Sequence, residues 1–123
     1  MKLIPAILSK TPEDFAEKAR LAESFTDYAQ IDFMDGRFVP AKSVSVDAVR
    51  LARPGFQMEA HLMVENPLSY LDDLRGAGFR RLYFHIEAPI RANSFIERAR
   101  AGFGSRYRIE ARDRGVGDKQ TGR

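Results

Sequence analysis

The sequence contains no cysteine, so disulfide bonds and catalysis by a thiolate are excluded. It also has no apolar run that approaches the roughly 20 residues needed to cross a bilayer. Its first residues hold one lysine and a short apolar stretch that Pro5 interrupts, not the longer apolar stretch of a signal peptide. The 123 residues suit one modest domain. We therefore expect a soluble, cytoplasmic chain without a membrane partner.

Acidic residues are outnumbered by basic ones only at the end of the chain. Residues 105–123 carry six basic and three acidic side chains, so the whole net charge of +3 lies there. An arm that binds nucleic acid would need a longer basic run with interleaved aromatic residues, and this segment offers only Tyr107. We interpret the segment as a solvated basic tail and expect no nucleic-acid partner.

Short apolar runs alternate with helical patterns along the chain. Strands are predicted at residues 3–8, 28–34, 57–64 and 81–86, residues 107–111 could begin a fifth, and helices are predicted at residues 11–22, 45–52, 66–76 and 92–101. This alternation predicts an α/β fold with parallel strands and helices packed on the sheet. About four strand-plus-helix units fit a small open sheet, or half of a (β/α)8 barrel, which typically needs about 250 residues.

Local signals predict how the helices begin and which side they bury. Thr11 and Asn66 each precede a proline, so both are expected to cap a helix. The second predicted helix carries the apolar residues Val46, Val49 and Leu51.

Two polar residues near strand ends are the candidates for chemistry. In parallel strand-helix units, catalytic groups gather at the carboxyl ends of the strands. Asp32 and His61 lie near such ends, each on the face opposite the helix-packing residues. A buried carboxylate is costly unless it is paired, so these two could share a metal ion or shuttle protons. The alternative is that both are structural residues.

Other polar and sulfur-containing residues favour plainer interpretations. A single histidine on a strand is more often structural, and we interpret His85 in this way. Met34 and Met63 are typical of ordinary core side chains. Asp35, with the glycine that follows it, is by itself a turn signal.

Four segments resemble the ribulose-phosphate 3-epimerase family in order and spacing, and each lies at a strand end. They are residues 4–9 (IPAILS), 31–40 (IDFMDGRFVP), 61–67 (HLMVENP) and 84–88 (FHIEA). The resemblance extends over about residues 2–104.

The resemblance implies a (β/α)8 barrel that interconverts ribulose 5-phosphate and xylulose 5-phosphate. In the family, one Asp removes the proton at C3 and a second Asp returns a proton on the other face. A divalent metal cation, held by two His and those two Asp, stabilises the enediolate. By resemblance, Asp32 is the first catalytic Asp and a metal ligand, and His61 is a metal ligand. Ser9, Met34 and Met63 are then expected to bind the substrate.

Three departures from the family pattern stand out. Gln30 occupies the position of the other metal-binding His, and an amide oxygen is a poorer ligand than imidazole for zinc-like metals. Ala6 stands where the family usually has a substrate-binding Ser. The second catalytic Asp and the phosphate-binding glycine loops belong to the second half of the barrel, and residues 105–123 do not resemble the family.

Three interpretations follow. In the first, residues 1–104 form units 1–4 of an epimerase-like barrel, and residues 105–123 are a basic tail, disordered or produced by a frameshift. In the second, the half-barrel pairs with itself or with a separate second-half chain, alongside its phosphorylated ketose substrate. In the third, the chain is an inactive binding or oligomerising remnant. We favour epimerase-like function, impaired in a chain of this length.

Overall fold

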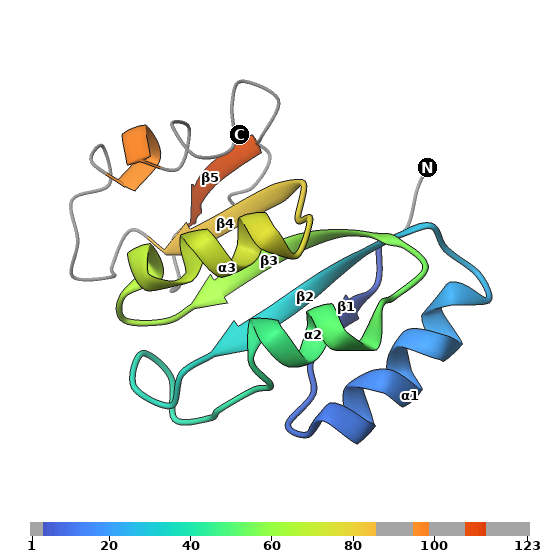
Figure 1. Cartoon of the computed structure of the whole chain (residues 1–123). Coiled ribbons are helices and arrows are strands. Elements are labelled where there is room, and N and C mark those ends of the chain that lie inside the picture. The colour runs from blue at the N-terminus through green and yellow to red at the C-terminus, as the bar shows by residue number, and fades with distance from the viewer. Residues whose placement is uncertain (1–3, 86–94, 99–107, 113–123) are drawn as a thin grey trace.

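The computed structural model describes residues 4–85, 95–98 and 108–112, in which five strands form one sheet (Figure 1). In the order of the sheet the strands are β1 (Ala6–Ile7), β2 (Tyr28–Met34), β3 (Gln57–Met63), β4 (Arg81–His85) and β5 (Arg108–Arg112). The helices are α1 (Pro12–Glu23), α2 (Val46–Ala52), the 3₁₀ helix η1 (Pro67–Tyr70) and α3 (Leu71–Gly76). Each neighbouring pair of strands is parallel.

The predicted α/β architecture is confirmed, because the parallel strands alternate with helices along the chain. The fifth strand begins and ends one residue later than predicted. Of the helix predicted at residues 92–101, the described residues 95–98 are helical and the rest lies outside the described residues. The domain boundary predicted after residue 104 stays a prediction, as does the origin of the tail.

β1 is shorter than the predicted strand. The carbonyl of Pro5 still accepts a hydrogen bond from the backbone N–H of Gln30 at 2.8 Å, but proline has no N–H to return. After Ile7, the carbonyl of Ser9 accepts from the N–H of Val44 at 3.0 Å. The backbone beyond Ile7 is therefore bonded to the segment before α2 instead of continuing along β2.

The helix starts agree with the sequence signals at one site and differ at the other. Thr11 Oγ1 accepts from the backbone N–H of Asp14 at 3.0 Å, which confirms the predicted cap of α1. Asn66 lies at the predicted N-cap position, before Pro67, but its side chain makes no capping hydrogen bond. Instead, the backbone carbonyl of Asn66 accepts from both the N–H and the hydroxyl of Ser69, which closes a tight 3₁₀ turn.

The helices lie together on one side of the sheet (Figure 1). Alternate residues of β2, namely Ala29, Ile31 and Phe33, are at most 1% exposed and belong to the same core as the buried residues of the helices. In α2, Val46 and Val49 are buried, whereas the third apolar residue, Leu51, is 66% exposed. Leu51 follows Val46 by five residues, which places it roughly 140° around the helix from Val46, where it faces solvent.

None of the helices in the described part of the chain is long and apolar enough to cross a bilayer. The longest, α1, has 12 residues and carries charged side chains on its exposed side.

A polar network occupies the amino ends of β2 to β4, on the face without the helices. Glu59 is only 3% exposed, and its carboxylate accepts from the hydroxyl of Tyr83 at 3.5 Å. The guanidinium of Arg81 lies 5.9 Å from the centroid of the Tyr28 ring. Burial first, and then the charge of Glu59, raise the pKa of Tyr28, so this phenol remains a hydrogen-bond donor. The buried carboxylate thus has the hydroxyl of Tyr83 as a donor and the cation of Arg81, its partner in the sheet register, nearby.

Candidate active site

The two predicted candidates lie on neighbouring strands in direct register. Asp32 of β2 pairs with His61 of β3 in the sheet, so their side chains project from the same face. That face is opposite the one covered by the helices, because Ile31 and Phe33, which flank Asp32, are in the core under the helices. The pairing arises from the parallel register alone and needs no unusual backbone geometry.

Asp32 and His61 are close enough to interact directly. The Nδ1 atom of His61 lies 3.2 Å from Oδ1 of Asp32. The side chains are 14% and 16% exposed for His61 and Asp32 respectively. Such a pair is shielded enough to strengthen its electrostatic interaction, yet still reachable by a ligand.

Gln30 contacts the same carboxylate oxygen as His61. The Nε2 atom of Gln30, two residues before Asp32 on β2, donates to Oδ1 of Asp32 at 3.0 Å. In this arrangement the amide of Gln30 acts as a hydrogen-bond donor that orients the carboxylate. An imidazole coordinating a metal at this position would instead present a lone pair.

His85 extends the pair into a row across three strands. Its Nε2 atom lies 3.0 Å from Nε2 of His61, and the two ring centroids are 5.1 Å apart. The ring of Phe38 lies on it with centroids 5.4 Å apart, and His85 is 6% exposed. Sequence reasoning missed this contact. His85 follows Tyr83 by two residues, and Tyr83 pairs with His61 in the sheet, so the two histidines lie on one face; this register is known only from the structure.

The two methionines form the next row along the same face. Met34 and Met63 pair in register, one alternation beyond Asp32 and His61 toward the carboxyl ends of β2 and β3. Met34 is 8% exposed and Met63 is partly buried. The structure therefore places both beside the candidate site, while their predicted role in substrate binding stays a prediction.

Ser9 lies in the loop after β1, where its backbone carbonyl bonds to Val44. Its hydroxyl oxygen is buried and has no hydrogen-bond partner among the described residues. A buried hydroxyl without a partner is costly. This is consistent with a ligand contact, and the predicted role of Ser9 in substrate binding stays a prediction.

Asp35 does more than its turn signal indicated. Its Oδ1 atom accepts from the backbone N–H groups of Arg37 and Phe38 at 2.9 and 3.0 Å, and Oδ2 accepts from the N–H of Glu65 at 2.8 Å. One carboxylate thus ties the loop after β2 to the loop after β3 at the end of the sheet where Asp32 lies. Burial raises the pKa of Asp35, but the three backbone donors outweigh it and hold the pKa below its ordinary value of 3.8.

We predict that Asp35→Asn destabilises the protein at pH 7 by about 1–2 kcal/mol, because the amide has one acceptor oxygen in place of two, so at least one of the three backbone donors loses its acceptor. The pKa of Asp35 is depressed in the folded state, so its stabilising contribution is present above pH 3.8. It is lost as the pH falls through the lower folded value. Urea unfolding at pH 7 and near pH 2–3 measures the difference, which should shrink in acid.

The control for this prediction is Asp72→Asn, because the side chain of Asp72 is 90% exposed. This variant should unfold like the parent chain at pH 7. An Asp35→Asn variant that loses equal stability at both pH values would contradict the role assigned to the carboxylate.

The donor atoms of Asp32 and His61 suit a divalent cation in part. Oxygen and nitrogen ligands of one zinc ion in tetrahedral geometry lie roughly 3.4 Å apart, since each bond is about 2.1 Å long. The 3.2 Å separation of Oδ1 and Nδ1 is compatible with that arrangement. Within the described residues, however, no group of three or more His, Cys, Asp or Glu is placed to hold a metal ion. The described donor set is therefore a partial site.

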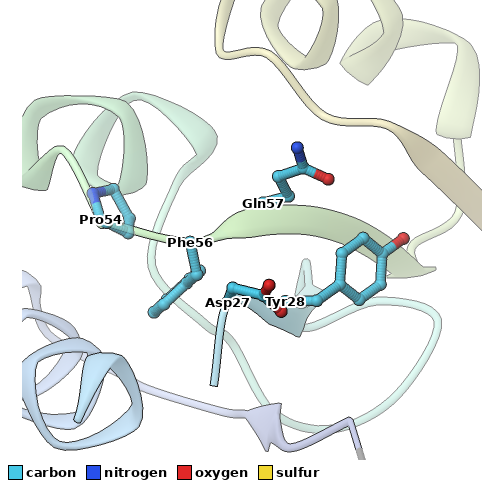
Figure 2. A pocket seen from close by; sticks show the side chains of 6 residues that line it. Asp27, Tyr28, Pro54, Phe56 and Gln57 are labelled. Atoms are coloured by element: carbon cyan, nitrogen blue, oxygen red, sulfur yellow. The ribbon is translucent and has the colours of Figure 1, made fainter. Parts of the chain in front are cut away.

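A separate hollow of about 310 Å³ lies at the opposite end of the sheet (Figure 2). It is lined by Asp27, Tyr28, Pro54, Gly55, Phe56 and Gln57, which surround the amino ends of β2 and β3. In parallel strand-helix folds this end serves stability, while chemistry collects at the carboxyl ends. The hollow therefore does not extend the site around Asp32.

Comparison with known proteins agrees with this arrangement. Residues 2–108 match the model of the ribulose-phosphate 3 epimerase family. A ribulose-phosphate 3-epimerase named as a cytoplasmic isoform, from Oryza sativa subsp. japonica, is 34% identical over 89 residues, which are 70% of this chain and 39% of that protein. The ribulose-phosphate 3-epimerase of Schizosaccharomyces pombe is 33% identical over 107 residues, covering 80% of this chain and 46% of the relative. That of Rhodobacter capsulatus is 32% identical over 104 residues, with coverage of 82% and 46%.

This chain thus spans less than half the length of these curated relatives. The family match nevertheless covers most of the chain, and it includes each strand that carries a candidate residue. The chain belongs to the ribulose-phosphate 3-epimerase family.

Proposed function

We propose that this chain carries the first catalytic carboxylate of an enzyme that interconverts ribulose 5-phosphate and xylulose 5-phosphate. The observation that supports the proposal most strongly is the 3.2 Å contact between Asp32 and His61, near the carboxyl ends of two parallel strands. Parallel strand-helix folds place their chemistry at this end. The names of the matching relatives agree with the same reaction.

In the proposed reaction, Asp32 takes the proton from C3 of the ketose. The electron pair of the broken C–H bond moves toward C2, and negative charge develops on the C2 oxygen. Gln30 and His61 hold the carboxylate in place, since both contact Oδ1. A divalent cation held by Asp32 and His61 would stabilise the developing negative charge. Ser9, Met34 and Met63 are proposed to contact the sugar phosphate.

Epimerisation also requires a proton donor on the opposite face of C3. Asp32 alone can remove a proton and return one from solvent to the same face, which exchanges the hydrogen without inverting the carbon. We therefore propose that inversion depends on a second Asp supplied by another part of the barrel, either in a second copy or in a separate second-half chain. We also propose a cytoplasmic location, which the name of the Oryza sativa relative, a cytoplasmic isoform, supports.

The test is hydrogen exchange at C3. The chain is incubated with ribulose 5-phosphate, and separately with xylulose 5-phosphate, in deuterated water with and without Zn²⁺ or Mn²⁺. Loss of the C3 proton signal above the rate in buffer is the expected result. Absence of exchange with both sugars and with every metal would overturn the proposal and favour the alternative, an inactive half-barrel that binds or oligomerises.

We predict that Gln30→His raises the affinity of the chain for Zn²⁺ roughly tenfold or more, because imidazole replaces a poor ligand next to Asp32 and His61. Isothermal titration calorimetry with Zn²⁺ measures the change. Gln57→His is the matched control, since Gln57 lies on the neighbouring strand β3 but at its amino end. Equal gains in the two variants would show that the added histidine acts alone, without Asp32 and His61.

A further inference from the structure

Asp32, His61 and His85 form a continuous row of contacts across β2, β3 and β4. His61 stands in the middle, with Nδ1 3.2 Å from Oδ1 of Asp32 and Nε2 3.0 Å from Nε2 of His85. Both ring nitrogens of His61 are therefore engaged. Whichever nitrogen carries the proton, the other must serve as an acceptor or as a ligand.

The contact between the two imidazoles couples their tautomers. Two neutral rings whose Nε2 atoms are 3.0 Å apart must present one N–H and one lone pair, because two protons or two lone pairs would repel each other. If His61 donates through Nε2, then His85 accepts through Nε2 and carries its own proton on Nδ1. The proton positions on the two rings are thus coupled, so that a change of tautomer at one requires a change at the other.

We propose that His85 is a positioning residue, which accepts the Nε2 proton of His61 and so leaves Nδ1 of His61, facing Asp32, to bind a divalent cation. The inference rests on the cation site of the proposed function. Histidine ligands of metals generally donate their second ring N–H to a neighbouring acceptor, which fixes the tautomer and the orientation of the ring. That acceptor is most often a carboxylate, a carbonyl or water, and here it is a second imidazole.

An imidazole at position 85 suits both states of the site. Without a cation, Nδ1–H of His61 donates to the carboxylate of Asp32, and His85 donates to Nε2 of His61. With a cation on Nδ1, both tautomers reverse. Lysine could only donate and a carboxylate could only accept, whereas Nε2 of a neutral imidazole can do either. Burial of His85 and the Phe38 ring, 5.4 Å away between centroids, hold the imidazole in place for both arrangements.

The chain contains only two histidines, so its imidazole nitrogen spectrum is simple to assign. The full chain with ¹⁵N-labelled histidine is recorded by long-range ¹H–¹⁵N NMR, with Zn²⁺ as the probe. We expect His61 to carry its proton on Nδ1 without Zn²⁺ and on Nε2 with Zn²⁺ bound. Zinc bound to Nε2 of His61 would overturn the inference.

Affinity for Zn²⁺ is then compared among variants. His85→Phe keeps an aromatic ring but removes the acceptor, and should weaken Zn²⁺ binding roughly 10–100-fold. His85→Gln keeps a group that can donate or accept, and should retain the parent affinity. His85→Gln also serves as the second variant if His85→Phe fails to fold. In that case, parent affinity for Zn²⁺ together with a proton on Nε2 of His61 supports the inference. Zinc bound to Nε2 of His61 overturns it.

Asp32→Asn separates the two ways in which the experiment can fail. If Asp32→Asn loses Zn²⁺ but His85→Phe binds it as tightly as the parent, only the role of His85 is overturned. If the parent chain does not bind Zn²⁺, or if Asp32→Asn binds it equally well, the proposed cation site is itself wrong and the inference fails with it.

Discussion

Replacing Asp32 with Asn is expected to lower the rate of C3 hydrogen exchange of ribulose 5-phosphate by roughly 10²–10⁴-fold, which is the usual contribution of a positioned general base. The amide keeps the size of the carboxylate but cannot accept the proton. The side chain is largely shielded, at 16% exposed, and Gln30 and His61 both contact its Oδ1. Deuterium incorporation followed by NMR measures the rate.

The control for the Asp32 experiment is the same chemical change at a solvent-facing position. Asp72 on α3 has a side chain that is 90% exposed, so Asp72→Asn should exchange the C3 hydrogen at the parent rate. Both variants should show the far-UV circular dichroism of the parent chain. If Asp32→Asn exchanges as fast as Asp72→Asn, another group removes the proton and the proposed role of Asp32 is wrong.

Replacing Phe33 with Ala is expected to destabilise the fold by about 3–5 kcal/mol, the usual cost of removing a fully buried phenylalanine. Phe33 is 0% exposed. Its ring centroid lies 5.8 Å from that of Phe79 and 6.2 Å from that of Tyr70, so the substitution removes two aromatic contacts and leaves a cavity. A domain is typically stable by about 5–15 kcal/mol, so the loss is a large fraction of the total.

Phe25→Ala is the matched control for Phe33→Ala, because the same atoms are removed from a side chain that is 65% exposed. Its effect should be within about 0.5 kcal/mol. Urea unfolding followed by circular dichroism compares the three chains. Similar losses at both positions would contradict the assignment of Phe33 to the core. Because Phe33 is adjacent to Asp32 on β2, partial unfolding of this variant should also slow C3 exchange.

Much of the fold followed from local patterns. The alternation of β2 separates Ile31 and Phe33 from Asp32, and the period of a strand is two whatever its neighbours are. Thr11 before a proline predicted the start of α1 correctly because capping depends on the nearest few residues. At Asn66 the rule gave the position of the helix start but not the capping group, because a 3₁₀ turn there uses the backbone carbonyl instead of the side chain.

The site was only partly predictable, because several of its contacts join segments that are far apart in the chain. The resemblance and the strand faces brought Asp32 and His61 together, but the sequence did not show that Gln30 donates to Asp32 or that His85 contacts His61. Asp35 likewise looked like a turn residue, and its bond to Glu65 joins two loops that are 30 positions apart in the chain. These contacts depend on distances between segments and not on neighbours in sequence.

The sequence by itself determined the alternation of strands and helices, the two faces of β2 and the family to which the chain is similar, because these depend on residue type and short spacing. Only the tertiary structure decided which polar atoms meet. Parallel register aligned Asp32 with His61, and side-chain packing brought the two imidazole Nε2 atoms to 3.0 Å. Hydrogen bonds act over about 3 Å, so a one-residue shift in strand pairing would separate these groups while leaving every sequence pattern intact.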